Sequence, residues 1–222
     1  MKKCVILISL FSLSCFIFSF SPKPARILSF AWAIISPNKN GEPETIDSSP
    51  PVISMENGDR IKFYLKPIEQ TFIYLFLVDT QNNLHLLFPE STGFFDTDYR
   101  QGNPYLIPEG TTWFRLDEPE GTEYFYLIGS PERLSELESL SAAYISLCDT
   151  AGEENPVKQE NAREAVIEII RSIQKETSPL AEGGEKFIPI SGSFRTIEEV
   201  AGSPAVLVQS KDIYVRTIRI RH

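Results

Sequence analysis

The stretch YLFLVDTQNNLHLLFPE, residues 74–90, decides the fold of this chain. Two apolar runs flank a short polar break, and the second run stops at Pro89. The run over 72–78 is apolar on both faces and too short for a typical helix, so we interpret it as a central strand covered on both sides. Asn82 and Asn83 tolerate the left-handed backbone that a tight turn requires. The stretch therefore predicts a β-hairpin buried at the centre of a domain, ended by a proline that cannot donate to the ladder.

Alternating and apolar runs on either side of the hairpin predict further strands. The stretch RIKFYLK, residues 60–66, alternates strictly, which is typical of a half-buried strand. We expect Ile61, Phe63 and Leu65 to face the core, and Arg60, Lys62, Tyr64 and Lys66 to face water. Other strands are expected at 106–116, 122–130, 186–190, 205–209 and 213–220.

The hydrophobic period changes after the strand at 122–130. Ser130 followed by Pro131 suggests a helix N-cap and first helical residue, and Asn155 followed by Pro156 repeats the signal. Apolar residues then recur at helical spacing over 134–147 and 162–173. The pattern predicts a mainly β (α+β) fold, an antiparallel β-sandwich or half-barrel with two helices inserted before the last strands.

Residues 1–21 have the form of a signal peptide. Lys2 and Lys3 precede an apolar run over 4–20, which is shorter than the roughly 20 residues of a membrane span. Cleavage is expected after residue 21 or as late as residue 33, where Ala31-Trp32-Ala33 has a suitable form. An uncleaved anchor and lipidation at Cys15 are the alternatives.

The segment after the leader is expected to be a disordered linker over 22–51. Its second half, SPNKNGEPETIDSSPP, is rich in proline, serine and acidic residues and has almost no apolar content. A single β-rich domain over 52–222 would follow, long enough for one hydrophobic core.

Charge and cysteine content limit the classes of function. The formal net charge is -9, so the chain lacks the basic footprint of a nucleic-acid-binding protein, and contact with a membrane is expected only through the leader or a lipid anchor. Beyond the leader only Cys148 is left, so no internal disulfide or cysteine-rich metal site is expected. We expect Cys148 to be a buried thiol at the end of a helical stripe.

No motif of the chain defines a reaction, a cofactor or a metal. The histidines are His85, expected to be a partly exposed strand residue, and His222, expected to be frayed. There is no phosphate-binding loop and no nucleophile elbow. Asp96 and Asp98 have the alternation of a calcium loop, but the rest of the EF-hand spacing is missing, which favours a solvated loop. We therefore predict no catalytic residues, no cofactor and no metal.

The loop over 90–105, which is rich in aromatic residues, is the best candidate for a binding site. A loop of this length in a compact domain is usually functional or packed on itself. Aromatic rings bury large areas at interfaces and on sugar-binding surfaces. The alternative is that the rings fold back and cap the core. The candidate binding residues are Phe94, Phe95, Asp96, Asp98, Tyr99, Tyr105 and Trp113.

Several segments resemble the bacterial module named domain of unknown function 4384. They are NGDRIKFYLKP, FIYLFLVDTQNNLHLLFPE, YLIPEG and EPEGTEYFYLIGS, within residues 55–130, with a looser likeness towards the C-terminus. The matching positions are Gly58, Asp59, Tyr74, Asp79, Leu87, Phe88, Pro89, Ile107, Pro108, Pro119, Gly121 and Glu123. The chain departs from the pattern at Asn82-Asn83, where the family has glycine, and at Glu90, where it has asparagine. The resemblance implies an accessory module of envelope or signalling proteins and assigns no catalytic residues.

Taken together, these features favour an exported, non-catalytic binding module, periplasmic or extracellular. Its partner would be an envelope protein or a polysaccharide, bound by the 90–105 loop or by a free sheet edge. One alternative is a hydrolase of envelope polymers that uses a carboxylate pair such as Asp96 and Glu118. The other is a structural lipoprotein held by Cys15.

Overall fold

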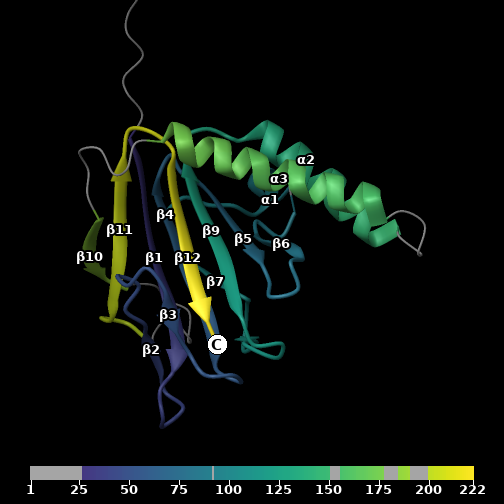
Figure 1. Cartoon of the computed structure of the whole chain (residues 1–222). Helices are drawn as coiled ribbons and strands as arrows, with labels where there is room; N and C mark the ends of the chain where they lie inside the picture. Colours follow the sequence, from purple (N-terminus) through teal and green to yellow (C-terminus); the bar gives the residue numbers. More distant parts are fainter. Residues whose placement is uncertain (1–26, 92, 151–155, 178–184, 191–199) are drawn as a thin grey trace, which may run out of the picture.

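The computed structural model describes residues 27–91, 93–150, 156–177, 185–190 and 200–222, which form two facing β-sheets with helices outside one of them (Figure 1). Sheet A has seven strands in the order β10-β11-β1-β4-β7, with β2 beside β1 and β8 beside β4. Their bounds are β1 (Leu28–Pro37), β2 (Pro43–Thr45), β4 (Arg60–Glu69), β7 (Tyr105–Ile107), β8 (Phe114–Arg115), β10 (Glu185–Pro189) and β11 (Pro204–Ser210).

Sheet B has five strands in the order β3-β12-β9-β5-β6. Their bounds are β3 (Ile53–Ser54), β5 (Phe72–Val78), β6 (Leu84–Phe88), β9 (Thr122–Ser130) and β12 (Tyr214–Arg221). The pairing is antiparallel throughout the described strands except between β3 and β12. The predicted α+β sandwich is confirmed, and the described strands do not close into a barrel.

Strand β1 corrects the predicted start of the domain. Its side chains alternate between the main core, which contains Phe30 and Trp32, and a second apolar cluster behind sheet A, which contains Ala31 and Ala33. Because β1 is a central strand buried on both faces, residues 28–37 belong to the fold, and the prediction of a linker over 22–51 is wrong there. The composition of 36–51 predicts a linker, but the apolar run before it forms a middle strand of sheet A. The predicted signal peptide, residues 1–21, lies outside the described residues.

The hairpin that decides the fold is confirmed. Strands β5 and β6 pair across a turn in which the Asp79 carboxylate accepts hydrogen bonds from the backbone of Gln81 and Asn83, and Asn82 has a φ of 69°. β5 is covered on both faces as expected, but β6 forms the edge of sheet B.

Strand β4 is buried more completely than its alternation suggests. Phe63 faces the core and packs against Phe125 of sheet B, with ring centroids 4.9 Å apart. Lys62 and Tyr64, expected to face water, are also buried, because the chain after β7 and the second apolar cluster cover the outer face of sheet A. The Lys62 ammonium lies 5.2 Å from the Trp113 ring centroid and donates a hydrogen bond to the Gly110 carbonyl. Burial lowers the pKa of Lys62.

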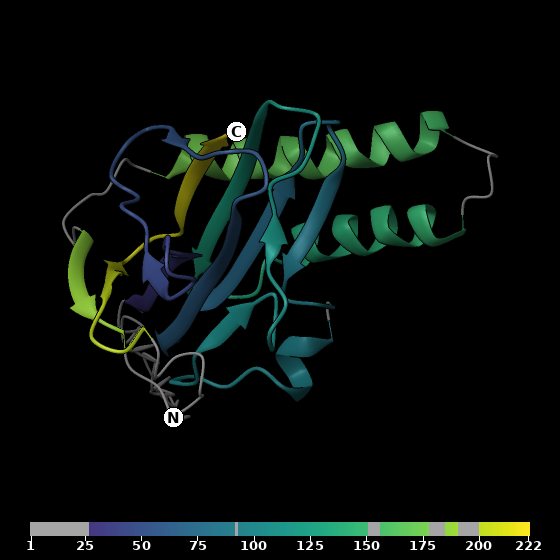
Figure 2. The ribbon, with the colours of Figure 1, turned by 90° about the horizontal axis from the view of Figure 1, so that it is seen from below.

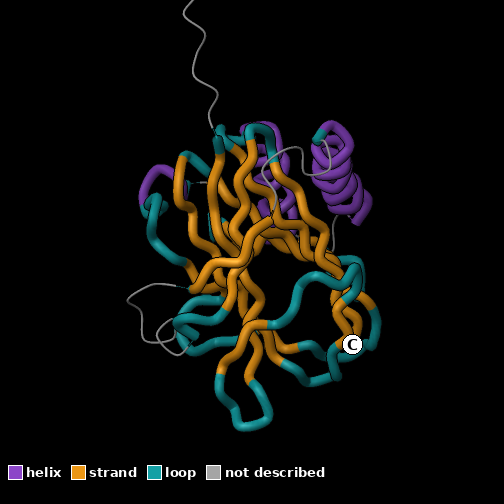
Figure 3. The backbone as a smooth tube through the Cα atoms, turned by 90° about the vertical axis from the view of Figure 1, so that its left-hand side faces the viewer, coloured by secondary structure: helices purple, strands orange, loops and turns teal. Residues whose placement is uncertain are grey.

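Two long helices follow β9, as predicted, and lie against the outer face of sheet B (Figures 2 and 3). They are α2 (Ser135–Thr150) and α3 (Pro156–Glu176), and a short helix, α1 (Phe94–Thr97), lies in the aromatic loop. Pro156 begins α3 as expected. The predicted N-cap at Ser130 is wrong, because β9 continues through Ser130. Cys148 is exposed, so the prediction of a buried thiol is also wrong. None of the helices in the described part of the chain is long and apolar enough to span a bilayer.

Candidate functional site

The aromatic loop packs on the core, which answers the question that its sequence leaves open. Phe95 and Tyr99 are 9% and 7% exposed. The rings of Tyr99 and Tyr105 stack with centroids 5.7 Å apart, and both pack against Phe88 of β6. The Tyr99 hydroxyl donates to the carbonyl of Thr71, and burial raises the pKa of that hydroxyl. Most of the ring surface proposed for a partner is therefore used inside the protein.

The other predicted site residues do not gather around one place. The exposed Asp96 carboxylate accepts two hydrogen bonds from Arg133, each of 2.8 Å, and Asp98 accepts one from Thr97. Trp113 lies over Lys62 behind sheet A, away from the cluster that contains Tyr99. In the described ranges no three His, Cys, Asp or Glu side chains are placed to hold a metal ion together.

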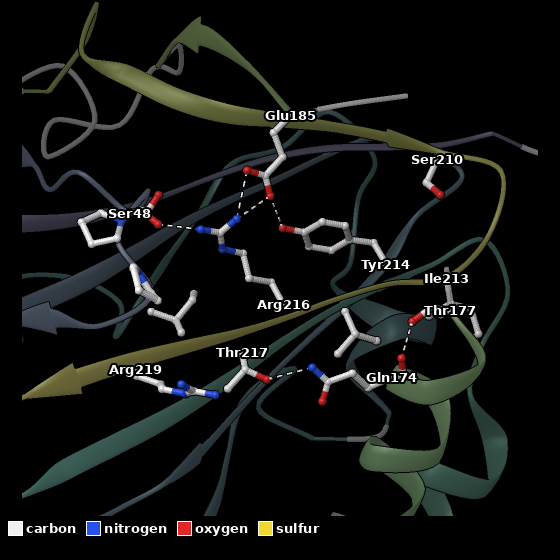
Figure 4. Close-up of a pocket in the computed structure, with 14 residues that line it drawn as sticks. Ser48, Gln174, Thr177, Glu185, Ser210, Ile213, Tyr214, Arg216, Thr217 and Arg219 are labelled. Atoms are coloured by element: carbon white, nitrogen blue, oxygen red, sulfur yellow. Dashed lines mark hydrogen bonds and ion pairs between the residues drawn. The ribbon is translucent and has the colours of Figure 1, made fainter. Parts of the chain in front are cut away.

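A cavity of about 450 Å³ runs along one edge of β12 (Figure 4). Strand β3 pairs only with Ile220 and Arg221, so no described strand pairs with residues 214–219 on the side away from β9. The cavity is lined by residues 213–219, the end of α3, the start of β10 and the chain before β3. These residues are Ser48, Pro50, Pro51, Gln174, Thr177, Glu185, Ser210, Ile213, Tyr214, Val215, Arg216, Thr217, Ile218 and Arg219.

The inner side of this edge is organised by Arg216. Its guanidinium donates to the Glu185 carboxylate at 2.7 and 3.0 Å and to the Ser48 carbonyl at 2.6 Å. The Tyr214 hydroxyl donates to the same carboxylate at 2.8 Å, and burial together with the Glu185 charge raises the pKa of Tyr214. The guanidinium also lies 5.5 Å from the centroid of the buried Trp32 ring. Because the Arg216 charge is matched by Glu185, this side of the cavity is polar and close to neutral.

The outer side of the edge is basic. Thr217 accepts a hydrogen bond of 3.3 Å from Gln174 of α3, and Arg219 follows on the same face of β12 (Figure 4). Arg219 is exposed, and no carboxylate of the described residues lies within ion-pair distance of it. The chain has a net charge of -9, but the outer face of this strand is locally positive.

Both histidines lie near the far end of β12, beside a pair of carboxylates. The His85 Nε2 atom is 3.1 Å from Asp79, and the His222 Nε2 atom is 4.0 Å from Glu123. The expectation for His85 agrees with its 48% exposed side chain. The expectation of a frayed His222 is wrong: its side chain is fully buried, because its backbone exchanges two hydrogen bonds with Gly121 and extends the ladder between β12 and β9.

The local environments of Glu123 and Asp79 shift the pKa values of the two carboxyl groups in opposite directions. Burial, together with the nearby Asp79 charge, raises the pKa of Glu123 to about 7. Burial also acts to raise the pKa of Asp79, but hydrogen bonds from Asn83 and His85 outweigh it, and the net pKa is lowered. Neither ring nitrogen of His222 has a hydrogen-bond partner among the described residues.

The fold is an α+β sandwich in which β12 of sheet B is only partly paired on the side away from β9, and part of the chain matches a known family model. Residues 54–133 match the family model described as Domain of unknown function (DUF4384), which confirms the resemblance read from the motifs. No curated protein and no solved structure matches the chain. The matched segment contains β4 to β9, and every residue that lines the cavity lies outside it.

Sequence reasoning missed this cavity. The signal was present in IYVRTIRI, residues 213–220, an expected strand that carries Arg216 and Arg219. Alternation predicts a strand, but it does not reveal which strand will lack a neighbour.

Proposed function

We propose that this chain is an exported, non-catalytic binding module of the cell envelope that accepts an extended segment of a partner protein along the free edge of β12. The observation that carries the proposal is the cavity along residues 213–219, where an unpaired strand edge is walled by polar side chains. A peptide added to a sheet edge gains affinity from backbone hydrogen bonds and specificity from its alternate side chains.

The dimensions of the edge suit this mode of binding. A strand rises about 3.3 Å per residue, so residues 213–219 offer roughly 20 Å of edge. Proteins usually protect such an edge with a bulge, a proline or a covering loop, because free N–H and C=O groups invite pairing. The loop that contains Pro50 and Pro51 lines the cavity, and β3 covers the edge only at Ile220 and Arg221.

Charge favours an acidic partner segment. Arg219 is exposed and has no acidic partner in the described part of the chain, whereas Arg216 is matched by Glu185. A carboxylate on the outer face of an added strand would lie near Arg219, and cross-strand pairs of opposite charge stabilise a sheet. Packing of the rings in the 90–105 loop supports the free edge over that loop as the binding surface.

The sequence of the leader supports the proposed export, and the position of β1 limits where the leader could be cleaved. Lys2, Lys3 and the apolar run over 4–20 have the form of a signal peptide. Ala31-Trp32-Ala33 lies within the buried part of β1, so cleavage after Ala33 would remove core side chains. We therefore place the processing site before Leu28. Anchoring through Cys15 is compatible with the same fold.

A hydrolase stands as a second candidate because the structure brings a carboxylate pair together, although not the expected pair of Asp96 and Glu118. Asp79 and Glu123 have pKa values shifted in opposite directions, as in enzymes that divide the roles of acid and base between two carboxyl groups. Hydrolysis of purified envelope polysaccharide that is abolished in Glu123→Gln would replace the binding proposal.

Site-specific photo-crosslinking tests the proposed binding surface. We would place p-benzoylphenylalanine at Gln174, at the rim of the cavity, and at the exposed Glu168 of the same helix as the matched control. The full chain with its leader would be expressed and irradiated in cells. We expect a discrete adduct at position 174 that is absent at 168, mapped by mass spectrometry to one segment of a partner protein.

A synthetic copy of the mapped segment must then bind the purified protein and lose affinity for Arg219→Glu. Identical adducts at both positions would overturn the proposal. So would a segment that binds Arg219→Glu with the same affinity as the parent protein.

A further inference from the structure

The two sheets have unequal widths at the edge where β12 lies. Phe30 of β1 packs against Tyr214 of β12 with ring centroids 5.5 Å apart, and Arg216 of β12 lies over Trp32 of β1. Strand β12 therefore faces β1. In sheet A, β11 and then β10 continue beyond β1, whereas in sheet B only the short β3 lies beyond β12. Among the described residues, this side of the sandwich therefore has one strand fewer in sheet B than in sheet A.

Phe187 of β10 lies on the part of sheet A that no described strand of sheet B covers; this part is called the floor of the gap below. In sheet A, Phe187 is paired with Val206, which is paired with Trp32, so the three side chains share one face. Trp32 and Val206 belong to the main core, so this face is the inward one. Phe187 is nevertheless 69% exposed, and we attribute this to the missing strand above it.

A second cavity lies over this floor. It has a volume of about 350 Å³, and Ser48 lines both it and the cavity beside β12. The Phe187 ring, Pro204 and Val206 give it an apolar wall, and Asp47 lies at its polar side. The indole N–H of Trp32, which also lines it, is buried and has no acceptor in the described part of the chain. An unsatisfied buried donor is destabilising and would favour a ligand that brings an acceptor.

From these observations we infer that the strand taken up beside β12 alternates in character, with an apolar side chain seated on Phe187 and acidic side chains facing Arg219. This inference rests on the proposed function and specifies its ligand. A strand added to sheet B lies about 4.8 Å from β12 and faces sheet A across about 10 Å, so its inward side chains meet β11 and β10. Its outward side chains meet the end of α3 and Arg219.

The charge of β12 argues against a second copy of this chain as the occupant. Antiparallel pairing of two β12 strands would bring the exposed Arg219 and Arg221 of both copies, which share the outer face of β12, onto one sheet edge. Like charges that face each other across strands are destabilising. A partner that carries aspartate or glutamate at alternate positions has the complementary pattern.

Binding of synthetic peptides tests the pattern. The first peptide alternates glutamate and valine, with one central phenylalanine in place of a valine, and the second has the same composition with the alternation scrambled. Titration would use the Trp113→Phe protein, which leaves Trp32 as its one tryptophan and a fluorescent reporter. We expect the alternating peptide to bind at least about tenfold more tightly than the scrambled one, which corresponds to about 1.4 kcal/mol.

Two variants separate this inference from the proposed function. Phe187→Ser changes an exposed side chain and should fold; we expect it to weaken binding of the alternating peptide about tenfold, in the range of an interface anchor. Arg219→Glu should weaken the same peptide and favour one with lysine in place of glutamate. If Arg219→Glu weakens binding and Phe187→Ser does not, the inference fails and the proposed function stands.

Other results would have wider consequences. Equal binding of the alternating and scrambled peptides would overturn the strand pattern. A concentration-dependent dimer in sedimentation, broken by Arg219→Glu, would make a second copy the occupant and also overturn the inference. If no peptide binds and the crosslink at Gln174 is absent, both the inference and the proposed function fail.

Discussion

At the level of single residues, Glu123 is a carboxyl group whose pKa is raised to about 7 by burial and by the nearby Asp79 charge. It lies on β9 at the end of sheet B, with Asp79 and His85 from the hairpin and His222 from the end of β12 around it. Its side chain is 14% exposed, and the proximity of Asp79 disfavours its charged form. A carboxyl group in this position holds its proton more tightly in the folded state than in the unfolded state.

Glu123 should make stability depend on pH in a specific direction. The pKa of Glu123 in the folded state, about 7, is raised above the ordinary 4.5. Its favourable contribution to the free energy of unfolding is therefore complete below pH 4.5 and is lost as the pH rises through 7. Each pKa unit corresponds to about 1.4 kcal/mol, and water at this end of the sheet weakens the effect, so we expect a loss on the order of 1–2 kcal/mol.

The variant Glu123→Gln should lose less stability over this pH range and be more stable than the parent at pH 8. Urea denaturation at a series of pH values measures this, with the exposed Glu120→Gln in the neighbouring turn as the control. Equal pH profiles for the parent and Glu123→Gln would contradict the assigned environment.

At the scale of elements, β1 holds the sandwich together. Its Phe30 packs across the core onto Tyr214 and lies so close to Gly129 of β9 that a Cβ there would approach the ring to 2.5 Å. Trp32 lies beneath Arg216 at the edge that we assign to binding. The strand therefore serves both the core and the proposed site.

The central place of β1 predicts the position of the mature N-terminus. Under the proposed export, mass spectrometry of the mature protein should find it before Leu28, whether by signal cleavage or by processing at Cys15. Trp32→Ala should destabilise the fold by about 3–5 kcal/mol, whereas Ala at the exposed neighbour Ile27 should have little effect. A mature chain that begins at residue 34, or a Trp32→Ala protein of parental stability, would show that β1 is dispensable.

Local sequence patterns predicted most individual helices and strands, but not which strands pair or which segments cover them. The hairpin over 72–88 and the helix from Pro156 could be read because turn residues and periodicity act within a few positions. Burial of Lys62 could not, because it depends on a chain segment some 50 residues away that covers the outer face of β4. β1 was missed for a similar reason, because its pairing with β4 and β11 depends on residues far along the chain, and the proline- and serine-rich segment after it predicted a linker.

At the scale of the whole molecule, the segment that matches the family builds a scaffold and the flanking segments build the proposed site. Residues 54–133 supply most of sheet B and part of sheet A, while the cavity is lined by residues before 54 and after 133. Alternation together with turn signals predicted an antiparallel sandwich or half-barrel, and the sandwich is confirmed. The unequal widths of its sheets could not, because strand order is set by contacts between distant parts of the chain.

The central claim is that a partner strand pairs with the free edge of β12. Hydrogen–deuterium exchange of the backbone amides, measured with and without the alternating peptide, tests it most directly. We expect the peptide to slow exchange within residues 214–219 and to leave the loop over 90–105 unchanged. Protection confined to the 90–105 loop, or no change along β12 when the peptide is bound, would contradict the account.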